Sequence, residues 1–432
     1  MSLNAVALIG VGVLLLLLFL GMNIGGAMLV VGFVGYAYVI NIQAALGLFQ
    51  TQFFTTAASY TLSVLPLFVL MGEFCYCSGL SRGLFNLSER VLGRLPGSLA
   101  CASVVACAGF GAICGSPTAT AATMGVVACP EMKEKGYADS LASGSVSVGG
   151  TLGIMIPPSS AFIVYGVLMG ESIGKLFAAG IIPGIILAVL CCFVIVILVK
   201  RNPSLAPEGR KYTAKEKLAA LKGIWGVAVL FLVVIGGIFI GWFTPNEGAA
   251  IGCLLGLIYM IITKNFNWEN VKFCAEETAK AFGMTFLIVI GATIFGSFLA
   301  ITRMPMALAA WVETLNVSRY LILFFILLVY AFLGMIMDAM AMLMLTVPIF
   351  SPVVLGLGFD GIWFGVMMVL VMELGLITPP VGLNCYVMAG ICKGVSLSTI
   401  FKGALPFAAA IFVAILLIVF IPGLATWLPS MM

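Results

Sequence analysis

Two stretches of the chain, GIMIPPS at residues 153–159 and GLITPPV at residues 375–381, each place a proline pair inside an apolar segment. They begin 222 residues apart, at Gly153 and Gly375. Proline lacks a backbone N–H and frees a carbonyl in the preceding turn, and lipid can satisfy no backbone polar group. Such a break persists in a membrane only where protein or a wet cavity covers it. Paired breaks in two halves of one chain indicate a transporter-type binding site.

The composition is that of a polytopic membrane protein. Of the 432 residues, 63% are hydrophobic and only 8% are charged, whereas soluble domains carry about 25% charged residues. The longest polar stretch, residues 200–222, is too short to bury a core of its own. We therefore predict an all-α membrane protein without a separate soluble domain. Residues 5–22 lack the basic flank and cleavage site of a signal peptide and are predicted to be a retained span.

The residue types present argue against several classes of function. The chain has no histidine, which excludes His-based zinc sites, Ser-His-Asp triads and histidine proton relays. Its 12 cysteines have no zinc-like spacing and are interpreted as small buried hydrophobic residues. The net charge of +4 is assigned to cytoplasmic loops. The sequence thus predicts neither an enzyme nor a transition-metal site, and no nucleic-acid partner.

Apolar segments long enough to cross a bilayer as helices make up most of the chain. The predicted full spans are residues 4–22, 24–40, 56–79, 137–170, 173–199, 223–242, 247–263, 280–302, 360–392 and 396–421. The two longest, 137–170 and 360–392, contain the proline pairs. Each of these two is therefore predicted to be a pair of half-helices.

Two further apolar regions are predicted to be re-entrant hairpins whose tips reach the middle of the membrane. Residues 97–132 are interrupted at Gly115–Thr118, and residues 319–356 are interrupted around Asp338. Each half has about 17 residues, which is short for a span. Irregular backbone at that depth again requires protein cover or a wet cavity.

These elements divide the chain into five predicted parts. The segments 82–94 and 304–316, one before each hairpin, are expected to lie along the membrane interface, and residues 269–280 are expected to form a third, charged helix. Each repeat contains one hairpin and one broken helix. The parts are N-terminal scaffold helices (1–55), a first repeat (56–200), a cytoplasmic loop (201–222), further scaffold helices (223–279) and a second repeat (280–422).

Positive charges predict the orientation of the chain. If residues 200–222 are cytoplasmic, 17 of the 20 lysines and arginines lie inside, and only Lys175, Arg303 and Arg319 lie outside. Both termini are then periplasmic. Five predicted crossings separate the starts of the two repeats, and because five is odd the repeats are predicted to be inverted. Inverted repeats allow one fixed site to face alternate sides of the membrane.

The hairpin tips and helix breaks supply the polar residues expected to carry function. Helix N-termini attract anions, whereas helix C-termini and freed carbonyls suit sodium, and hard cations prefer oxygen ligands. The oxygen-bearing side chains at these positions are Ser116, Thr118, Thr120, Ser159, Ser160, Asp338, Thr346, Thr378 and Asn384. The alternative for the hydroxyls is bonding to a carbonyl of their own helix.

Asp338 is the most informative of these residues. An ionised aspartate at mid-membrane costs about 2.5–3.5 kcal/mol on insertion scales, and a bound sodium ion would offset that cost. The alternatives are a protonated Asp338 bonded within a helix interface and a proton-coupling carboxyl. Glu373 is also expected at depth, where it either pairs with a cation or fixes the broken helix.

Four motifs make the chain similar to a known family. GSPTATAA at 115–122, the PPS break at 157–159, GMIMD at 334–338 and TPPVG at 378–382 resemble the large membrane subunit of tripartite ATP-independent periplasmic (TRAP) transporters. The resemblance covers essentially the whole chain. It implies a sodium-driven importer of organic acids in the bacterial inner membrane, with an elevator motion of the hairpin-containing domain against a fixed scaffold. The implied partners are a small four-helix membrane subunit, expected as a separate chain, and a soluble periplasmic binding protein.

Carried over residue by residue, the resemblance implies two sodium ions and no other metal. The first site would use Ser103, Gly115, Ser116, Thr118, Gly153 and Pro157. The second site would use Asp338, Gly375 and Thr378. Substrate would lie between the tips, near Ser116, Ser159, Ser160, Asp338 and Asn384.

Family members carry dicarboxylates, sialic acids, other sugar acids or keto acids, and the overall resemblance favours a sialic acid (N-acetylneuraminate) over a C4-dicarboxylate. The alternative function is a stand-alone sodium-dicarboxylate symporter of similar architecture that needs no binding protein. A channel is disfavoured because Asn-Pro-Ala tips are missing. An intramembrane enzyme is disfavoured because the sequence has neither an HExxH motif nor a paired-aspartate site.

Overall fold

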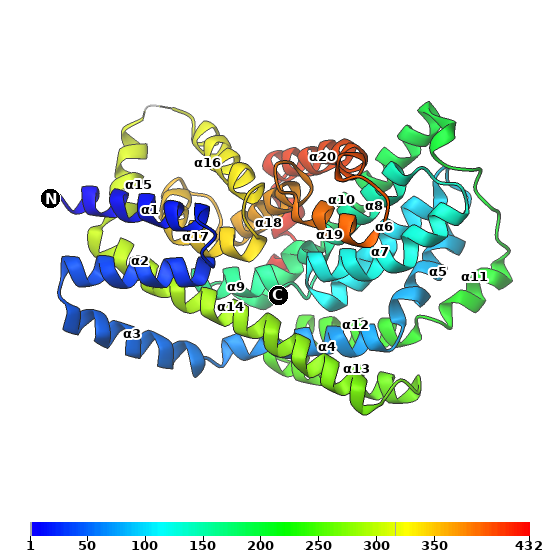
Figure 1. Ribbon diagram of the computed structural model, residues 1–432, viewed down its shortest axis with the longest axis horizontal. Helices are drawn as coiled ribbons and strands as arrows, with labels where there is room; N and C mark the ends of the chain where they lie inside the picture. Colours follow the sequence, from blue (N-terminus) through cyan, green and yellow to red (C-terminus); the bar gives the residue numbers. More distant parts are fainter. Residues whose placement is uncertain (1, 316) are drawn as a thin grey trace.

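The computed structural model describes residues 2–315 and 317–432, and the regular elements in these ranges are all helices (Figure 1). The first are α1 (Leu3–Phe19), α2 (Ile24–Val39), α3 (Ile42–Ala57), α4 (Val64–Cys77), α5 (Leu80–Leu92), α6 (Ser98–Cys114) and α7 (Pro117–Glu134). Next come α8 (Asp139–Met155), α9 (Ser160–Met169), α10 (Ile173–Arg201), α11 (Ala214–Leu221), α12 (Trp225–Phe239), α13 (Pro245–Ile262) and α14 (Trp268–Thr302). The last are α15 (Met304–Thr314), α16 (Arg319–Gly334), α17 (Ala339–Gly356), α18 (Gly361–Ile377), α19 (Leu383–Ile391), α20 (Leu397–Phe420) and α21 (Gly423–Thr426).

The helices fit a membrane environment. Among the described residues, six helices are long and apolar enough to cross a bilayer, and two bent helix pairs raise that number to eight. Large apolar side chains on the outside of the bundle are exposed, including Phe19, Phe54 and Leu232. Lipid contact explains this exposure, since water would penalise it. The prediction of an all-α protein with several membrane-crossing helices is therefore confirmed for the described residues.

Helices α6 and α7 form a hairpin that turns at Gly115 and Ser116. Gly115 ends α6 with a positive φ of +63°, a conformation that glycine adopts without steric cost. Ser116 begins α7, because its hydroxyl accepts a hydrogen bond from the Ala119 N–H at 3.4 Å. Pro117 occupies the first helical position, where its missing N–H is not needed.

The helices stop at both proline pairs. Helix α8 ends before Pro157, and α9 begins at Ser160 after Ser159 accepts a cap bond from the Phe162 N–H (3.3 Å). Helix α18 ends before Thr378, and α19 begins after Gly382, which has a φ of +57°. Both Pro-Pro peptide bonds are cis.

A second hairpin, α16 and α17, precedes the second broken helix. It turns at residues 335–338, and Asp338 caps α17 by accepting a hydrogen bond from the Ala341 N–H at 3.3 Å. The order of one hairpin followed by one broken helix thus occurs twice in the chain. The inverted orientation of the two copies stays a prediction.

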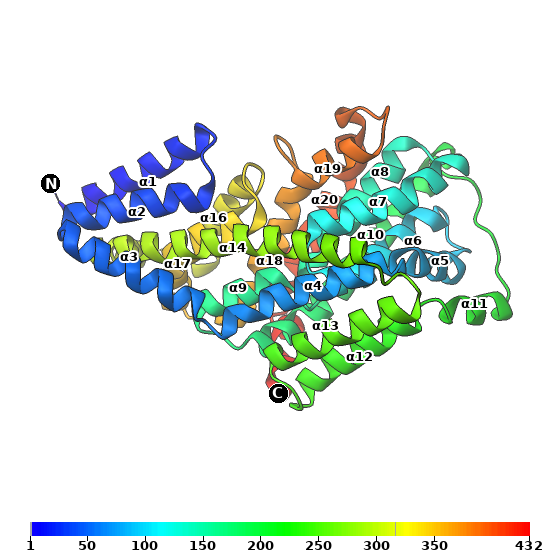
Figure 2. The same cartoon turned by 60° about the horizontal axis from the view of Figure 1, so that its bottom comes forward.

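Two predicted helix boundaries were wrong. The charged segment 269–280 and the span 280–302 form one 35-residue helix, α14, because no proline interrupts them and a change from polar to apolar residues does not end a helix. This helix runs along the elongated molecule beside α4 (Figure 2). The predicted 279/280 domain boundary therefore falls inside one helix. The span predicted at 56–79 is the second arm of a pair bent by 53°, and its first arm, α3, was not predicted.

The interfacial helix predicted before the second hairpin is α15, which ends at Thr314. Residue 316, where that prediction ended, lies outside the described residues, as does residue 1 of the predicted N-terminal part. Helix α5 occupies most of the segment 82–94 and packs on α6 with one apolar face.

Helices α2 and α14 touch at their backbones, so substitution of Gly32 tests the packing of these two helices. A Cβ atom on Gly32 would lie 2.7 Å from the Phe295 backbone, which cannot rotate away. Small residues at such contacts allow membrane helices to approach closely. We expect Gly32→Val to cost about 1–3 kcal/mol, as overpacking commonly does, and to lower the thermal unfolding midpoint in detergent. Gly12→Val on α1, where a Cβ meets nothing within 4 Å, is the control; equal midpoints for the two variants would contradict this packing.

Candidate functional site

The first hairpin tip packs directly against the first helix break. Ser160 Oγ donates a hydrogen bond to the Gly115 carbonyl at 2.7 Å. A side chain on Gly115 would lie 3.0 Å from the Pro158 carbonyl oxygen, so glycine permits this approach. Pro158 cannot donate to the Ile154 carbonyl one turn earlier, and Ser159 Oγ donates to that oxygen instead, at 2.5 Å. Ser159 therefore satisfies a carbonyl freed at the break, and Ser160 holds the tip against it.

Three helices meet at one backbone contact just below this tip. A Cβ atom on Gly111 of α6 would lie 2.9 Å from Gly153 N on α8. A Cβ atom on Gly153 would lie 2.9 Å from Thr120 Oγ1 and 3.2 Å from the Ser116 carbonyl oxygen of α7. Thr120 Oγ1 itself donates to that carbonyl at 2.7 Å. The contact therefore gathers backbone and hydroxyl oxygens, which are the ligands that sodium prefers.

The second tip and second break make an equivalent contact. The Val381 N–H donates to the Met335 carbonyl at 3.1 Å. A Cβ atom on Gly375 would lie 2.6 Å from the Gly334 carbonyl oxygen, so α16 and α18 also touch at their backbones. Thr378 Oγ1 donates to the Leu374 carbonyl at 2.5 Å, within its own helix. Two residues predicted for the second sodium site, Gly375 and Thr378, thus lie at the junction of this tip and break.

The two tips face each other across one cavity of about 190 Å³. The lining includes Ser116 and Thr118 from the first tip, Ser160 from the first break, and Asp338 from the second tip. These residues are half-buried. Segments more than 200 residues apart in the sequence therefore contribute hydroxyl and carboxylate oxygens to one cavity, together with the N-terminal ends of α7, α9 and α17.

Helices α4 and α14 form the remaining wall of this cavity, which was not predicted. Residues that line it from these helices are Leu65, Val69, Ala281, Phe282, Met284, Thr285 and Ile288. Thr285 bonds its hydroxyl to Ala281 O of its own helix. The sequence did not single out these residues of α4 and α14, because both helices are uniformly apolar spans at this point.

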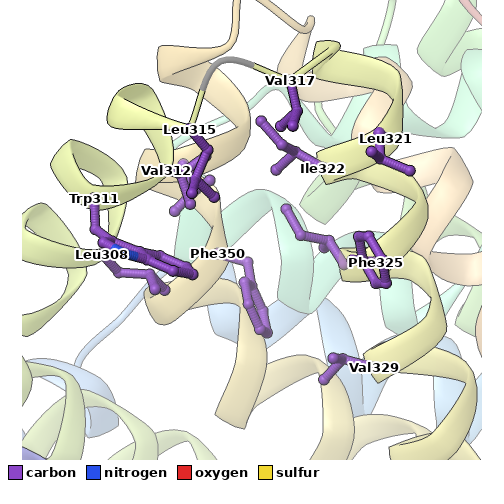
Figure 3. Close-up of a pocket in the computed structure, with 12 residues that line it drawn as sticks. Leu308, Trp311, Val312, Leu315, Val317, Leu321, Ile322, Phe325, Val329 and Phe350 are labelled. Carbon is purple, nitrogen blue, oxygen red and sulfur yellow. The ribbon is translucent and has the colours of Figure 1, made fainter.

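A different cavity of about 360 Å³ lies between α15, α16 and α17 (Figure 3). Its lining is entirely apolar, and Trp311, Phe325 and Phe350 stand around it. Such a lining offers no oxygen to a cation and no donor array to an anion. The cavity between the tips is therefore the candidate functional site.

Seven of the predicted site residues do not line this cavity. Gly153, Pro157, Gly375 and Thr378 lie instead at the breaks and their backbone contacts. The other three are Ser103, Ser159 and Asn384. Ser103 is fully buried in α6, donates to Leu99 O at 2.8 Å, and lies about 18 Å along the helix from the tip, at 1.5 Å per residue. Ser159 is buried and is used in capping α9 and satisfying the break. Asn384 is buried against α8, where its Nδ2 donates to the Ser147 carbonyl at 3.0 Å. The structure therefore does not bring these side chains together with Ser116, Ser160 and Asp338.

The two breaks differ in their surroundings. Pro157 and Pro158 are buried, whereas Pro379 and Pro380 are exposed. The cavity reaches the first break but not the second. The two halves of the chain thus share the order of their elements, but their proline pairs differ in burial.

An all-helical chain with several membrane-crossing helices and a polar cavity at two hairpin tips has the architecture of a polytopic membrane transport protein. Residues 11–424 match the family described as the tripartite ATP-independent periplasmic transporter, DctM component. The match covers nearly the whole chain, and the chain belongs to this family. The resemblance predicted from the four motifs is confirmed.

Relatives in this family carry different substrate names. The chain is 34% identical to the C4-dicarboxylate TRAP transporter large permease protein DctM of Pseudomonas aeruginosa, with 88% of each chain covered. It is 30% identical to the sialic acid TRAP transporter large permease protein SiaM of Vibrio cholerae, with 96% of each covered. Among solved structures, the Alcanivorax borkumensis YdaH transporter is similar with a TM-score of 0.57 at 15% identity, covering 88% of each chain. This last likeness concerns the fold alone.

Substitution of Gly111 tests the backbone contact under the first tip. Gly111→Ala places a Cβ against the Gly153 backbone, which cannot move aside. We expect the hairpin to shift away from α8 and substrate uptake into proteoliposomes to fall by about tenfold or more, which corresponds to about 1.4 kcal/mol. Gly109→Ala, two residues earlier on α6, meets only the flexible Leu84 side chain and should retain uptake. If both variants transport equally, the contact is not needed to position the tip.

Proposed function

We propose that this chain is the substrate-translocating permease of a sodium-coupled importer of organic acid anions. The single observation that carries the proposal is the cavity in which Ser116, Ser160 and Asp338 meet from the two tips and the first break. Its family supports an ATP-independent energy source. Sodium coupling, use of a binding protein and the elevator motion are parts of the proposal.

Sodium is supported by the chemistry of the tips. Asp338 is half-buried and makes no ion pair among the described residues. A negative charge at membrane depth costs free energy, and a bound cation offsets that cost. The oxygens of Ser116 and Thr120 beside Gly153 give the first tip a second set of hard ligands. We therefore propose two sodium ions, one at each tip.

An anionic substrate is supported by the helix ends around the cavity. Helices α7, α9 and α17 all begin at its lining, and helix N-termini favour negative charge. A carboxylate substrate also offsets part of the charge of two sodium ions, or all of it if the substrate is a dianion. A C4-dicarboxylate and a sialic acid are the two candidates, since one relative carries each name.

Coupling to the membrane potential follows for a monoanion such as a sialic acid, whereas two sodium ions with a C4-dicarboxylate dianion carry no net charge. Two sodium ions entering with one monoanion carry one net positive charge, which gains about 2.3 kcal/mol per 100 mV. Each 1.4 kcal/mol supports about tenfold accumulation. We propose that the hairpins and broken helices move together as an elevator against α4 and α14, and that the differing exposure of the two proline pairs reflects one end of that motion.

The proposed partners are a small four-helix membrane subunit and a periplasmic binding protein, in keeping with the three-part family description. The proposed location is the bacterial inner membrane, with both termini in the periplasm. Uptake of labelled sialic acid and of labelled succinate into proteoliposomes tests these assignments. An inward sodium gradient and the small subunit are supplied, and the binding protein is added or omitted. Uptake that requires both sodium and the binding protein supports the proposal, and uptake without the binding protein favours a stand-alone symporter.

Replacement of Asp338 tests its assignment to sodium. Asn caps helices as well as Asp does, so Asp338→Asn keeps the start of α17 but removes the charge. We expect the sodium concentration for half-maximal uptake to rise about tenfold, which corresponds to about 1.4 kcal/mol of lost binding. Asp360→Asn is the matched control, because Asp360 caps α18 through the Trp363 N–H at 2.8 Å and lies outside the cavity. An unchanged sodium dependence in Asp338→Asn would remove Asp338 from the ion site.

A further inference from the structure

A hydrogen bond joins the two broken helices at the point where they cross. Thr151 of α8 and Glu373 of α18 lie 222 residues apart, the same offset that relates the two proline pairs, and Thr151 Oγ1 donates to Glu373 Oε2 at 3.2 Å. Both side chains are fully buried, at 0% exposure. Equivalent positions of the two halves therefore contact each other deep inside the protein, and one of them is a carboxyl.

Asn384 reaches the same turn of α8 from the other side of the second break. Its Nδ2 donates to the Ser147 carbonyl at 3.0 Å. A helical carbonyl points toward the next turn, so the Ser147 oxygen points toward Thr151. Glu373 and Asn384 thus bond to one helical turn, which spans about 5.4 Å. The second break separates them in the chain, since α18 carries Glu373 and α19 carries Asn384.

Each of these two side chains leaves one buried oxygen without a hydrogen-bond partner. The atoms are Glu373 Oε1 and Asn384 Oδ1. Such atoms are rare in proteins and cost about 1–3 kcal/mol each when nothing compensates. No lysine or arginine pairs with Glu373 within the part of the chain that the structure describes. The two free oxygens thus lack a hydrogen-bond donor or a cation.

A proton and a monovalent cation are the two occupants that could meet this need. Thr151 has one hydroxyl proton and lies 2.8 Å from the Val148 carbonyl as well as 3.2 Å from Glu373, so the carboxyl shares even this donor. A proton on Glu373 Oε1 that is donated to Asn384 Oδ1 would partner both oxygens and neutralise the carboxyl, so a protonated Glu373 is the competing occupant that the sodium count below tests. A monovalent cation ligated by both free oxygens would also neutralise the carboxylate and would keep Glu373 ionised, and oxygen is the ligand that sodium accepts.

We propose that Glu373 and Asn384, supported by Thr151, bind one sodium ion at the crossing of α8 and α18. This inference rests on the proposed sodium coupling and adds an ion to the two at the tips. None of the three residues lines the cavity between the tips, so the site is separate. The ion bridges α18 and α19 across the second break and fixes both to α8. Its binding therefore determines the geometry of the second break, whose proline pair is exposed.

Counting bound sodium tests the proposal. The probe is radioactive ²²Na⁺ alone, measured at saturation on the purified complex with its small subunit. Glu373→Gln keeps the size of the side chain and removes the charge. We expect this variant to lose one bound ion per complex while retaining the ions of the tips. Asp338→Asn should lose a different ion, so the double variant should lose two.

A second variant guards against failure of Glu373→Gln to fold. Thr151→Val removes the supporting hydroxyl and should weaken ²²Na⁺ binding at one site by about tenfold, or about 1.4 kcal/mol. Thr302→Val is its matched control, because Thr302 is also buried and bonds only to Leu299 O of its own helix. Full ²²Na⁺ binding in both Glu373→Gln and Thr151→Val, with a loss in Asp338→Asn, would overturn this site and leave the proposed function standing. Absence of ²²Na⁺ binding in the wild type would overturn both.

Discussion

Every backbone group freed inside the membrane has to find its partner within the protein, and this constraint organises the structure. Two proline pairs end α8 and α18 in mid-segment. The Ile154 carbonyl, freed by the first proline pair, accepts a hydrogen bond from the Ser159 hydroxyl. Ser160 beside it donates to the Gly115 carbonyl at the first hairpin tip. In the second half, the Val381 N–H donates to the Met335 carbonyl. Each hairpin tip is therefore held by the break beside it, and the tips are placed by the satisfaction of backbone groups.

Close backbone packing makes these contacts possible. Gly111 against Gly153, and Gly334 against Gly375, allow a hairpin helix to touch a broken helix in each half. With both tips held in this way, Ser116 and Asp338 line one cavity against α4 and α14. In the alternating access that we propose, a shift of the hairpins against the long helices would change which side the cavity faces.

Much of this arrangement could be predicted from the sequence because the residues at the breaks have strong local rules. Proline stops a helix, a glycine with positive φ ends one, and serine or aspartate begins one, so both tips and both breaks were found. Side-chain direction follows no such rule. Asn384 follows the second break in sequence, yet it points to Ser147 instead of the cavity. Ser103 bonds to its own helix, far from the tip. The sequence did not predict that α14 lines the cavity, because the lining residues belong to a uniform apolar span. It also did not predict that α14 is one helix, because the charged residues at its start resemble a separate helix.

If sodium binds at the hairpin tips, the cavity between them should respond to sodium. Cys114 precedes the first tip, lines this cavity and is partly exposed, so it is a native reporter. We would measure its alkylation by N-ethylmaleimide in the purified complex, in sodium and in choline, by mass spectrometry of the Cys114 peptide. Cys253, which is partly exposed and outside the cavity, is the internal control. We expect sodium to slow modification of Cys114 by about tenfold, equivalent to about 1.4 kcal/mol, and to leave the modification of Cys253 unchanged. Equal rates at Cys114 in sodium and choline would contradict a sodium-dependent site at the tips.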